Sequence, residues 1–162
     1  MRPTVAMEAI EALYRARAAD FLRFALAKTG DPDRARDAVQ DGFAHAIRSR
    51  ATFRGTGSLE AWVARCVINA AHDLNRVASD SPLEPEDVAA GSVIESDAGA
   101  ALVRAAVRRL PPRQRDALFL RHYLDLDYHA IAEVLDVEVG TVSATLHAAR
   151  NSLRDALQEV PR

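Results

Sequence analysis

Cysteine is almost absent from the chain, which contains only Cys66. A single cysteine excludes a disulfide within the chain, and no second cysteine stands at a spacing typical of a zinc site. No run of about 18 apolar residues is long enough to cross a bilayer, and the first residues lack the long apolar core of a signal peptide. We therefore expect a cytoplasmic protein that is not inserted into a membrane.

The motifs of catalysis are missing as well. The five histidines are dispersed, no glycine-rich loop is suited to cradle a phosphate, and no serine stands in a nucleophile elbow. We expect no enzyme activity, no catalytic residues, no cofactor and no metal site.

Aromatic residues and glycines are also few, whereas alanine, leucine and arginine are abundant. This composition favours helix, and no segment alternates polar and apolar residues for long enough to predict a strand. A hydrophobic content of 49% in 162 residues suffices for one or two small cores. The sequence predicts an all-α fold.

The net charge of −2 is unevenly distributed: residues 1–77 carry +3, residues 78–98 carry −6 and residues 99–162 carry +1. The middle segment contains two prolines, one glycine and no basic residue, so it is poorly suited to build a core. We expect two small helical domains, 1–77 and 99–162, joined by a flexible acidic linker, 78–98.

Capping signals predict where the helices begin and end. A first helix stops at Gly30, and Asp31 with Pro32 is a strong start for a second, because Asp accepts from free amides and proline suits the first turn. Ser58 is placed to cap a third helix. The helices expected before the last 40 residues are 7–29, 32–50, 59–76, 100–110 and 112–123.

The stretch 127–157 has the spacing of a helix-turn-helix. Two apolar stripes recur at helical period, formed by Tyr128, Ile131, Ala132 and Leu135, then by Val142, Leu146, Ala149, Leu153 and Leu157. Asp136 stands at the corner, where a residue that tolerates left-handed backbone is needed. Gly140 and Thr141 suit the start of the second helix. An ordinary helical hairpin has the same spacing, so both interpretations remain open.

Three segments together resemble a known family. They are GDPDRARDAVQDGFAHAI, FRGTGSLEAWVARCVINAAHDLNR and LPPRQRDALFLRHYLDLDYHAIAEVLDVEVGTV, and in this order they are similar to the two domains of extracytoplasmic-function (ECF) sigma factors of the sigma-70 family. The resemblance covers about 13–76 and 103–157. It implies a dissociable subunit of bacterial core RNA polymerase, whose first domain opens and reads the −10 promoter element and whose second reads the −35 element. It also implies an anti-sigma factor as a possible partner.

The helix expected from residue 32 presents a polar face that suits a basic protein partner. Asp37, Gln40 and Asp41 lie away from the apolar stripe, and carboxylates accept charge-assisted bonds from arginine. In the family this helix docks on polymerase, and Asp37 and Gln40 match its pattern. A merely solvated face would have the same composition.

The loop 52–57 combines an aromatic residue, an arginine and two glycines, which allows close backbone approach and base stacking. With the resemblance, it predicts a pocket for a flipped base of the −10 non-template strand. Trp62 shares an apolar stripe and is expected in the core. The expected −10 residues are Phe53 and Arg54 in the loop, Asn69 as amide donor, and Arg65, His72 and Arg76 as phosphate contacts.

The helix that would read the −35 duplex is weakly basic. Members of the family commonly have basic residues early in this helix, whereas the cations here are delayed to Arg150 and Arg154. Because phosphate contacts supply most nonspecific affinity, this domain should bind DNA weakly alone. The expected −35 residues are Thr141, Ser143, Ala144, Thr145, His147 and Arg150. The alternative is a stand-alone helix-turn-helix regulator or a sigma-like adaptor, which would not need the first domain.

Overall fold

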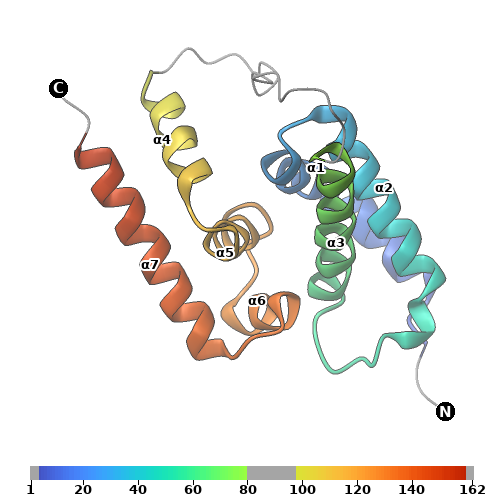
Figure 1. The fold of residues 1–162 in the computed structure, drawn as a ribbon. Coiled ribbons are helices and arrows are strands. Elements are labelled where there is room, and N and C mark those ends of the chain that lie inside the picture. Colours follow the sequence, from blue (N-terminus) through green and yellow to red (C-terminus); the bar gives the residue numbers. More distant parts are fainter. Residues whose placement is uncertain (1–3, 80–97, 160–162) are drawn as a thin grey trace.

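The computed structural model describes residues 4–79 and 98–159, which form seven α-helices, one 3-10 turn and no strand (Figure 1). The predicted all-α fold is therefore confirmed. The first half contains α1 (Met7–Thr29), α2 (Pro32–Arg48), a 3-10 turn (Arg50–Thr52) and α3 (Leu59–Ser79). The second half contains α4 (Ala98–Arg109), α5 (Pro112–Tyr123), α6 (Tyr128–Leu135) and α7 (Val139–Gln158). The expected linker, 78–98, lies outside the described residues except for its two ends, which belong to α3 and α4.

The expected boundary between α1 and α2 is confirmed. Gly30 adopts a left-handed conformation with φ 68°, and its amide donates to the Leu26 carbonyl at 2.8 Å. Asp31 caps α2 by accepting from the Arg34 amide at 2.8 Å. The helix ends two residues earlier than expected, because the chain tightens into the 3-10 turn.

The core of the first half lies between α1, α2 and α3. Phe21 of α1 meets Phe43 of α2 edge to face, with ring centroids 5.1 Å apart. Gly42 allows α2 to approach α3 closely, because a Cβ at this position would lie 2.6 Å from the Val67 Cα. The three helices thereby form a tightly packed unit that holds α3 with one face outward.

The helix-turn-helix is present at α6 and α7. Asp127 caps α6 by accepting from the Ala130 amide at 2.8 Å, and Asp136 has the expected left-handed conformation with φ 54°. Ile131 and Leu146 are fully buried, as their stripes predict. Gly140 and Thr141 lie in the first turn of α7, as expected, but the helix begins at Val139 and has no side-chain cap.

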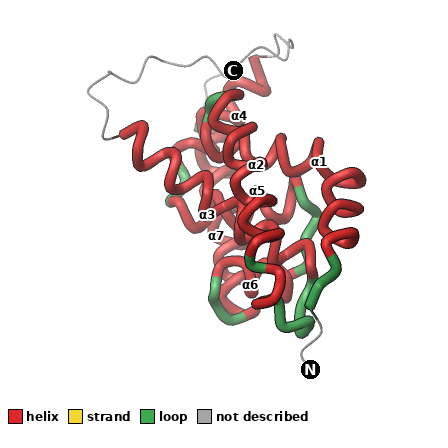
Figure 2. The backbone as a smooth tube through the Cα atoms, turned by 90° about the vertical axis from the view of Figure 1, so that its right-hand side faces the viewer, coloured by secondary structure: helices red, strands yellow, loops and turns green. Residues whose placement is uncertain are grey.

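The two halves are in direct contact. Helix α5 packs against α1 and α6 packs against α3, and buried residues of both halves form one continuous apolar cluster. Figure 1 shows α5 and α6 between the long helices of the two halves, and in the turned view of Figure 2 loops join the described helices of each half, the one before α3 being extended. This packing places α6 beside the loop that precedes α3.

Candidate nucleic-acid interface

The polar face of α2 lies outward, as expected. Asp37, Gln40 and Asp41 are exposed, while Val39 and Phe43 are buried beneath them. The helix is held against α1 and α3 by its apolar side, so its orientation is fixed. The three polar side chains are free to meet a partner without any change in the fold.

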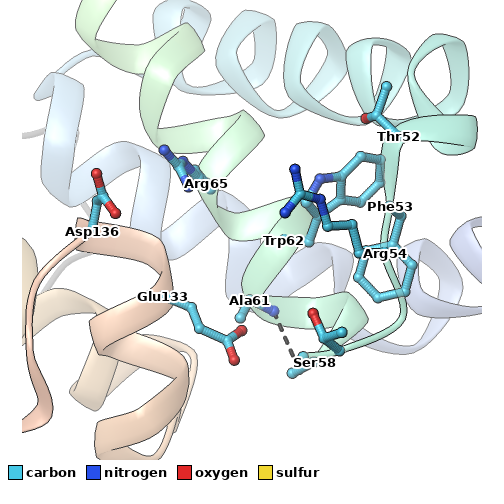
Figure 3. A pocket seen from close by; sticks show the side chains of 11 residues that line it. Thr52, Phe53, Arg54, Ser58, Ala61, Trp62, Arg65, Glu133 and Asp136 are labelled. Carbon is cyan, nitrogen blue, oxygen red and sulfur yellow. Dashed lines mark hydrogen bonds between the residues drawn. The ribbon is translucent and has the colours of Figure 1, made fainter.

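The loop before α3 is shaped by local hydrogen bonds. The Thr52 hydroxyl donates to the Ser49 carbonyl at 2.8 Å, and Gly55 has φ 70°, which favours glycine. Ser58 then accepts from the Ala61 amide at 3.3 Å and caps α3 (Figure 3). These contacts turn the segment 53–57 back across the first turns of the helix.

A pocket of about 400 Å³ lies between this loop and α3 (Figure 3). Its volume is in the range of small-molecule sites. The residues that line it are Thr52, Phe53, Arg54, Thr56, Gly57, Ser58, Ala61, Trp62, Arg65, Glu133 and Asp136. The structure thus brings together three of the six expected −10 residues, Phe53, Arg54 and Arg65.

Trp62 has a double role. Its side chain is half-buried and packs against the core, as its stripe predicts, but it also lines the pocket. The Phe53 and Trp62 rings are 5.3 Å apart between centroids and tilted by 53°. The expectation that Trp62 serves only the core is therefore too narrow, because part of its ring belongs to the pocket wall.

Asn69, His72 and Arg76 do not line the pocket. They follow Arg65 on successive turns of α3 and are exposed. Two of them have acidic neighbours: His72 Nε2 is 3.6 Å from Asp116 Oδ2, and Arg76 Nη2 is 3.2 Å from Asp73 Oδ1. Arg65, Asn69, His72 and Arg76 form a row that leads from the pocket along α3, which suits an extended strand better than a compact ligand.

The exposed face of α7 has the expected residues, with one difference. Thr141, Ser143, Ala144, His147 and Arg150 are exposed, whereas Thr145 is half-buried. A second hollow is lined by Arg113, Leu135, Val137, Thr141, Val142 and Thr145. Thr145, which is one of the expected −35 residues, thus lies at the edge of the contact between α6 and α7.

Two carboxylates of the pocket were missed by sequence reasoning. Glu133 and Asp136 belong to the second half, and they reach the pocket only because α6 packs against α3. No local pattern marks them, since Asp136 has an evident role in the turn and Glu133 is an ordinary exposed residue of α6.

The remaining candidates for chemistry are unpromising. Burial raises the pKa of the Cys66 thiol to about 11, which keeps it protonated and a poor nucleophile. Residues 4–79 and 98–159 contain no group of His, Cys, Asp and Glu side chains placed to bind a metal. Among these same residues, no helix has the length and apolarity to cross a bilayer.

The chain matches two family profiles, Sigma-70 region 2 over residues 13–80 and Sigma-70 region 4 over residues 100–153. It is 33% identical to the RNA polymerase sigma-H factor of Pseudomonas aeruginosa, over 82% of this chain and 77% of that protein. It is 30% identical to the RNA polymerase sigma-E factor of Streptomyces coelicolor, over 91% of this chain and 85% of that protein.

Among solved structures, the chain resembles the sigma factor RpoE of Bartonella quintana in complex with the anti-sigma factor NepR. The TM-score is 0.69 and the identity 21%, with 96% of this chain and all of that chain covered. This likeness supports the fold across both halves. Because both sigma-70 regions are present in order, the two profiles and the relatives identify the chain as an alternative RNA polymerase sigma factor of the extracytoplasmic-function group of the sigma-70 family.

Proposed function

We propose that three surfaces of this sigma factor have separate roles in initiation. The exposed face of α2 binds core RNA polymerase, the pocket before α3 takes a flipped base of the −10 non-template strand, and α7 reads the −35 duplex. Residues 1–77 and 99–162 act as the two functional domains on either side of the linker 78–98. The protein acts in the cytoplasm as a binding subunit and not as an enzyme.

The observation that carries the proposal furthest is the pocket, which supports the role in capture of the −10 strand. It unites two aromatic rings, two arginines and the backbone of Gly57, and the exposed row on α3 begins at its edge. Aromatic rings stack on bases regardless of sequence, and arginine is suited to phosphate oxygens. An amide such as that of Asn69 adds the donor and acceptor pair that reads a base edge.

The −10 pocket is tested with holoenzyme reconstituted from this chain and bacterial core polymerase. Mapping transcription starts on genomic DNA yields the promoters, and open-complex formation is then measured for Phe53→Ala and Asn69→Ala. Loss of one stacking group typically costs about 1–3 kcal/mol, so we expect a decrease of about 5- to 150-fold for Phe53→Ala. Val77→Ala is the matched control, because Val77 is an exposed apolar residue of α3 that does not line the pocket. Normal promoter opening by both pocket variants would place the site elsewhere.

The polymerase surface is tested by direct binding. Asp37→Ala and Gln40→Ala should weaken affinity for core polymerase, since a hydrogen bond to a charged group contributes about 1.5–3 kcal/mol. Asp155→Ala on α7 is the control for loss of an exposed carboxylate, and circular dichroism checks helicity. Unchanged affinity of both folded α2 variants would contradict the assignment.

We extend the proposal to one protein partner. The structural relative from Bartonella quintana was solved with an anti-sigma factor, and this chain has a similar fold over both halves. An anti-sigma factor that binds this chain would be detected as a protein that displaces it from core polymerase.

A further inference from the structure

The pocket before α3 contains charged groups from both halves of the molecule. Arg54 and Arg65 belong to the first half, and Glu133 and Asp136 project toward the same cavity from the second (Figure 3). All four residues are exposed, so their side chains can be reached from solvent. Capture of a DNA strand uses the two arginines but gives no function to the two carboxylates.

These four charges do not neutralise one another in pairs. Within residues 4–79 and 98–159, neither arginine lies within ion-pair distance of Glu133 or Asp136, and none of the four side chains makes a hydrogen bond. Unpaired cations and carboxylates that converge on one cavity leave both donors and acceptors for a ligand. The cavity therefore suits a small molecule that carries an anionic group together with N–H donors.

The apolar wall of the cavity is aromatic. The rings of Phe53 and Trp62 are 5.3 Å apart between centroids and tilted by 53°. Trp62 packs against the core, which holds its ring in place. Planar ring systems stack on aromatic side chains. This wall indicates that the small molecule also contains a flat ring.

Glu133 is the carboxylate that lies nearer to this wall. Its side chain comes so close to the loop that a Cβ at Gly57 would overlap its Oε2. In Figure 3 the Glu133 carboxylate points toward Ser58, whereas Asp136 lies beyond Arg65. A carboxylate has two acceptor oxygens and can bind two adjacent donors at once. Glu133 is therefore placed to accept from the edge of a ring that stacks on the wall.

Guanine matches these groups better than the other nucleobases. Its edge carries the N1–H and the N2 amino group side by side, whereas adenine and cytosine have an amino group next to an acceptor nitrogen. Arginine is suited to the phosphate oxygens of a nucleotide. The cavity volume of about 400 Å³ is in the range of sites for molecules of this size.

We propose that this cavity binds a free guanine nucleotide while the two halves are in contact. The base stacks on Phe53 and Trp62, Glu133 accepts from its N1–H and N2 amino group, and Arg54 and Arg65 bind the phosphates. This site goes beyond the capture of the −10 strand and does not depend on it, because Glu133 comes from the second half. A ligand that contacts both halves stabilises the arrangement in which they meet.

Nucleotide binding is measured on the full chain, free of polymerase, with GDP as the probe. Trp62 is the only tryptophan in the chain, so quenching of its fluorescence reports a base at the pocket, and calorimetry gives the affinity independently. We expect GDP to saturate the protein with a dissociation constant below about 1 mM. ADP tests the guanine edge and guanosine tests the phosphates, and each should bind at least about tenfold more weakly.

Two variants assign the ends of the nucleotide. Glu133→Gln should weaken binding of GDP by about tenfold or more and leave ADP unchanged, because only guanine donates twice to the carboxylate. Arg65→Ala should weaken GDP and ADP alike and leave guanosine unchanged.

The matched controls are Glu138→Gln and Arg104→Ala, which are exposed residues that do not line the pocket. Both should bind GDP as the unchanged chain does, and circular dichroism verifies the helicity of every variant. The nucleotide site is wrong if GDP does not saturate the protein by about 1 mM, if ADP binds as tightly as GDP, or if Glu133→Gln keeps the preference for GDP. These outcomes leave the −10 role untouched, because that role is decided by promoter opening with Phe53→Ala holoenzyme.

Discussion

Two glycines show how a single backbone angle determines the effect of a substitution. Gly30 ends α1 with φ 68°, whereas Gly140 lies within the first turn of α7. A Cβ at either position would meet no heavy atom within 4 Å, so steric contact does not distinguish them. What differs is the conformation, because left-handed backbone is unfavourable for L-residues other than glycine.

Gly30→Ala should therefore destabilise the protein by about 1 kcal/mol, while Gly140→Ala should stabilise it by about 0.4–1 kcal/mol. The gain at Gly140 arises because alanine restricts the unfolded chain at a position where its own native conformation is helical. Urea unfolding of both variants measures the two effects, and each variant is the control for the other. Equal changes of the same sign would show that φ is not the deciding property.

Residues with a local physical role were predicted well from the sequence. Asp31 caps α2 and Asp136 takes the left-handed corner because each needs only its own neighbours in the chain. Trp62 and Thr145 were described incompletely, since each lies at the edge between a packed face and a hollow. Helical spacing gives the direction of a side chain but does not show what closes over it.

At the scale of elements, α7 is the least typical part of the molecule. Its exposed face carries small and hydroxyl side chains near its start, and the exposed cation Arg150 comes about three turns later. His147 on this face already has a polar neighbour, because its Nε2 lies 3.1 Å from Asn151 Nδ2 on the next turn. The helix thus offers shape and hydroxyl groups, and little positive charge, to the −35 duplex that we propose it reads.

Ser143→Arg tests whether the missing charge limits promoter binding. Ser143 is exposed near the start of α7, so an arginine there should add about one phosphate contact. We expect holoenzyme carrying this variant to bind promoters of different −35 sequence more tightly, with a salt dependence steeper by about one counterion. Ser152→Arg, on an exposed position of the last turns of the same helix, is the control. A gain limited to one −35 sequence would instead indicate that position 143 reads a base.

At the scale of the whole molecule, the order of the helices was predictable and their packing across the two halves was not. Each helix is marked by its caps and its apolar spacing, which are local signals. The contact of α5 with α1 pairs Lys28 with Asp116, residues 88 positions apart, and no local pattern at either one indicates the other. The same holds for Glu133 at the pocket before α3. These features depend on how two folded units meet, which the order of residues along the chain does not reveal.

The buried ion pair of Lys28 and Asp116 gives a prediction for the whole molecule: removing one charge should separate the halves, whereas removing both should not. Lys28→Met leaves the Asp116 carboxylate without its lysine partner, and Asp116→Leu leaves the Lys28 ammonium unpaired. Either change should separate the halves, because opening lets water solvate the unpaired charge. The double variant Lys28→Met/Asp116→Leu buries no unpaired charge of this pair, so the halves should close again.

Spin labels at Arg36→Cys on α2 and Ser152→Cys on α7, both exposed positions, are introduced in a Cys66→Ala background, and pulsed EPR measures the distance between them in all three variants. The control is Arg76→Met/Asp73→Leu with its two single variants, because that ion pair is exposed, with side chains 72% and 69% accessible, and exposed pairs contribute less than about 1 kcal/mol. These control variants should leave the distance unchanged. The prediction is wrong if the double variant at Lys28 and Asp116 is more open than either single variant. In that case the attraction between the two charges holds the halves together, and the cost of an unpaired buried charge does not decide whether the protein opens.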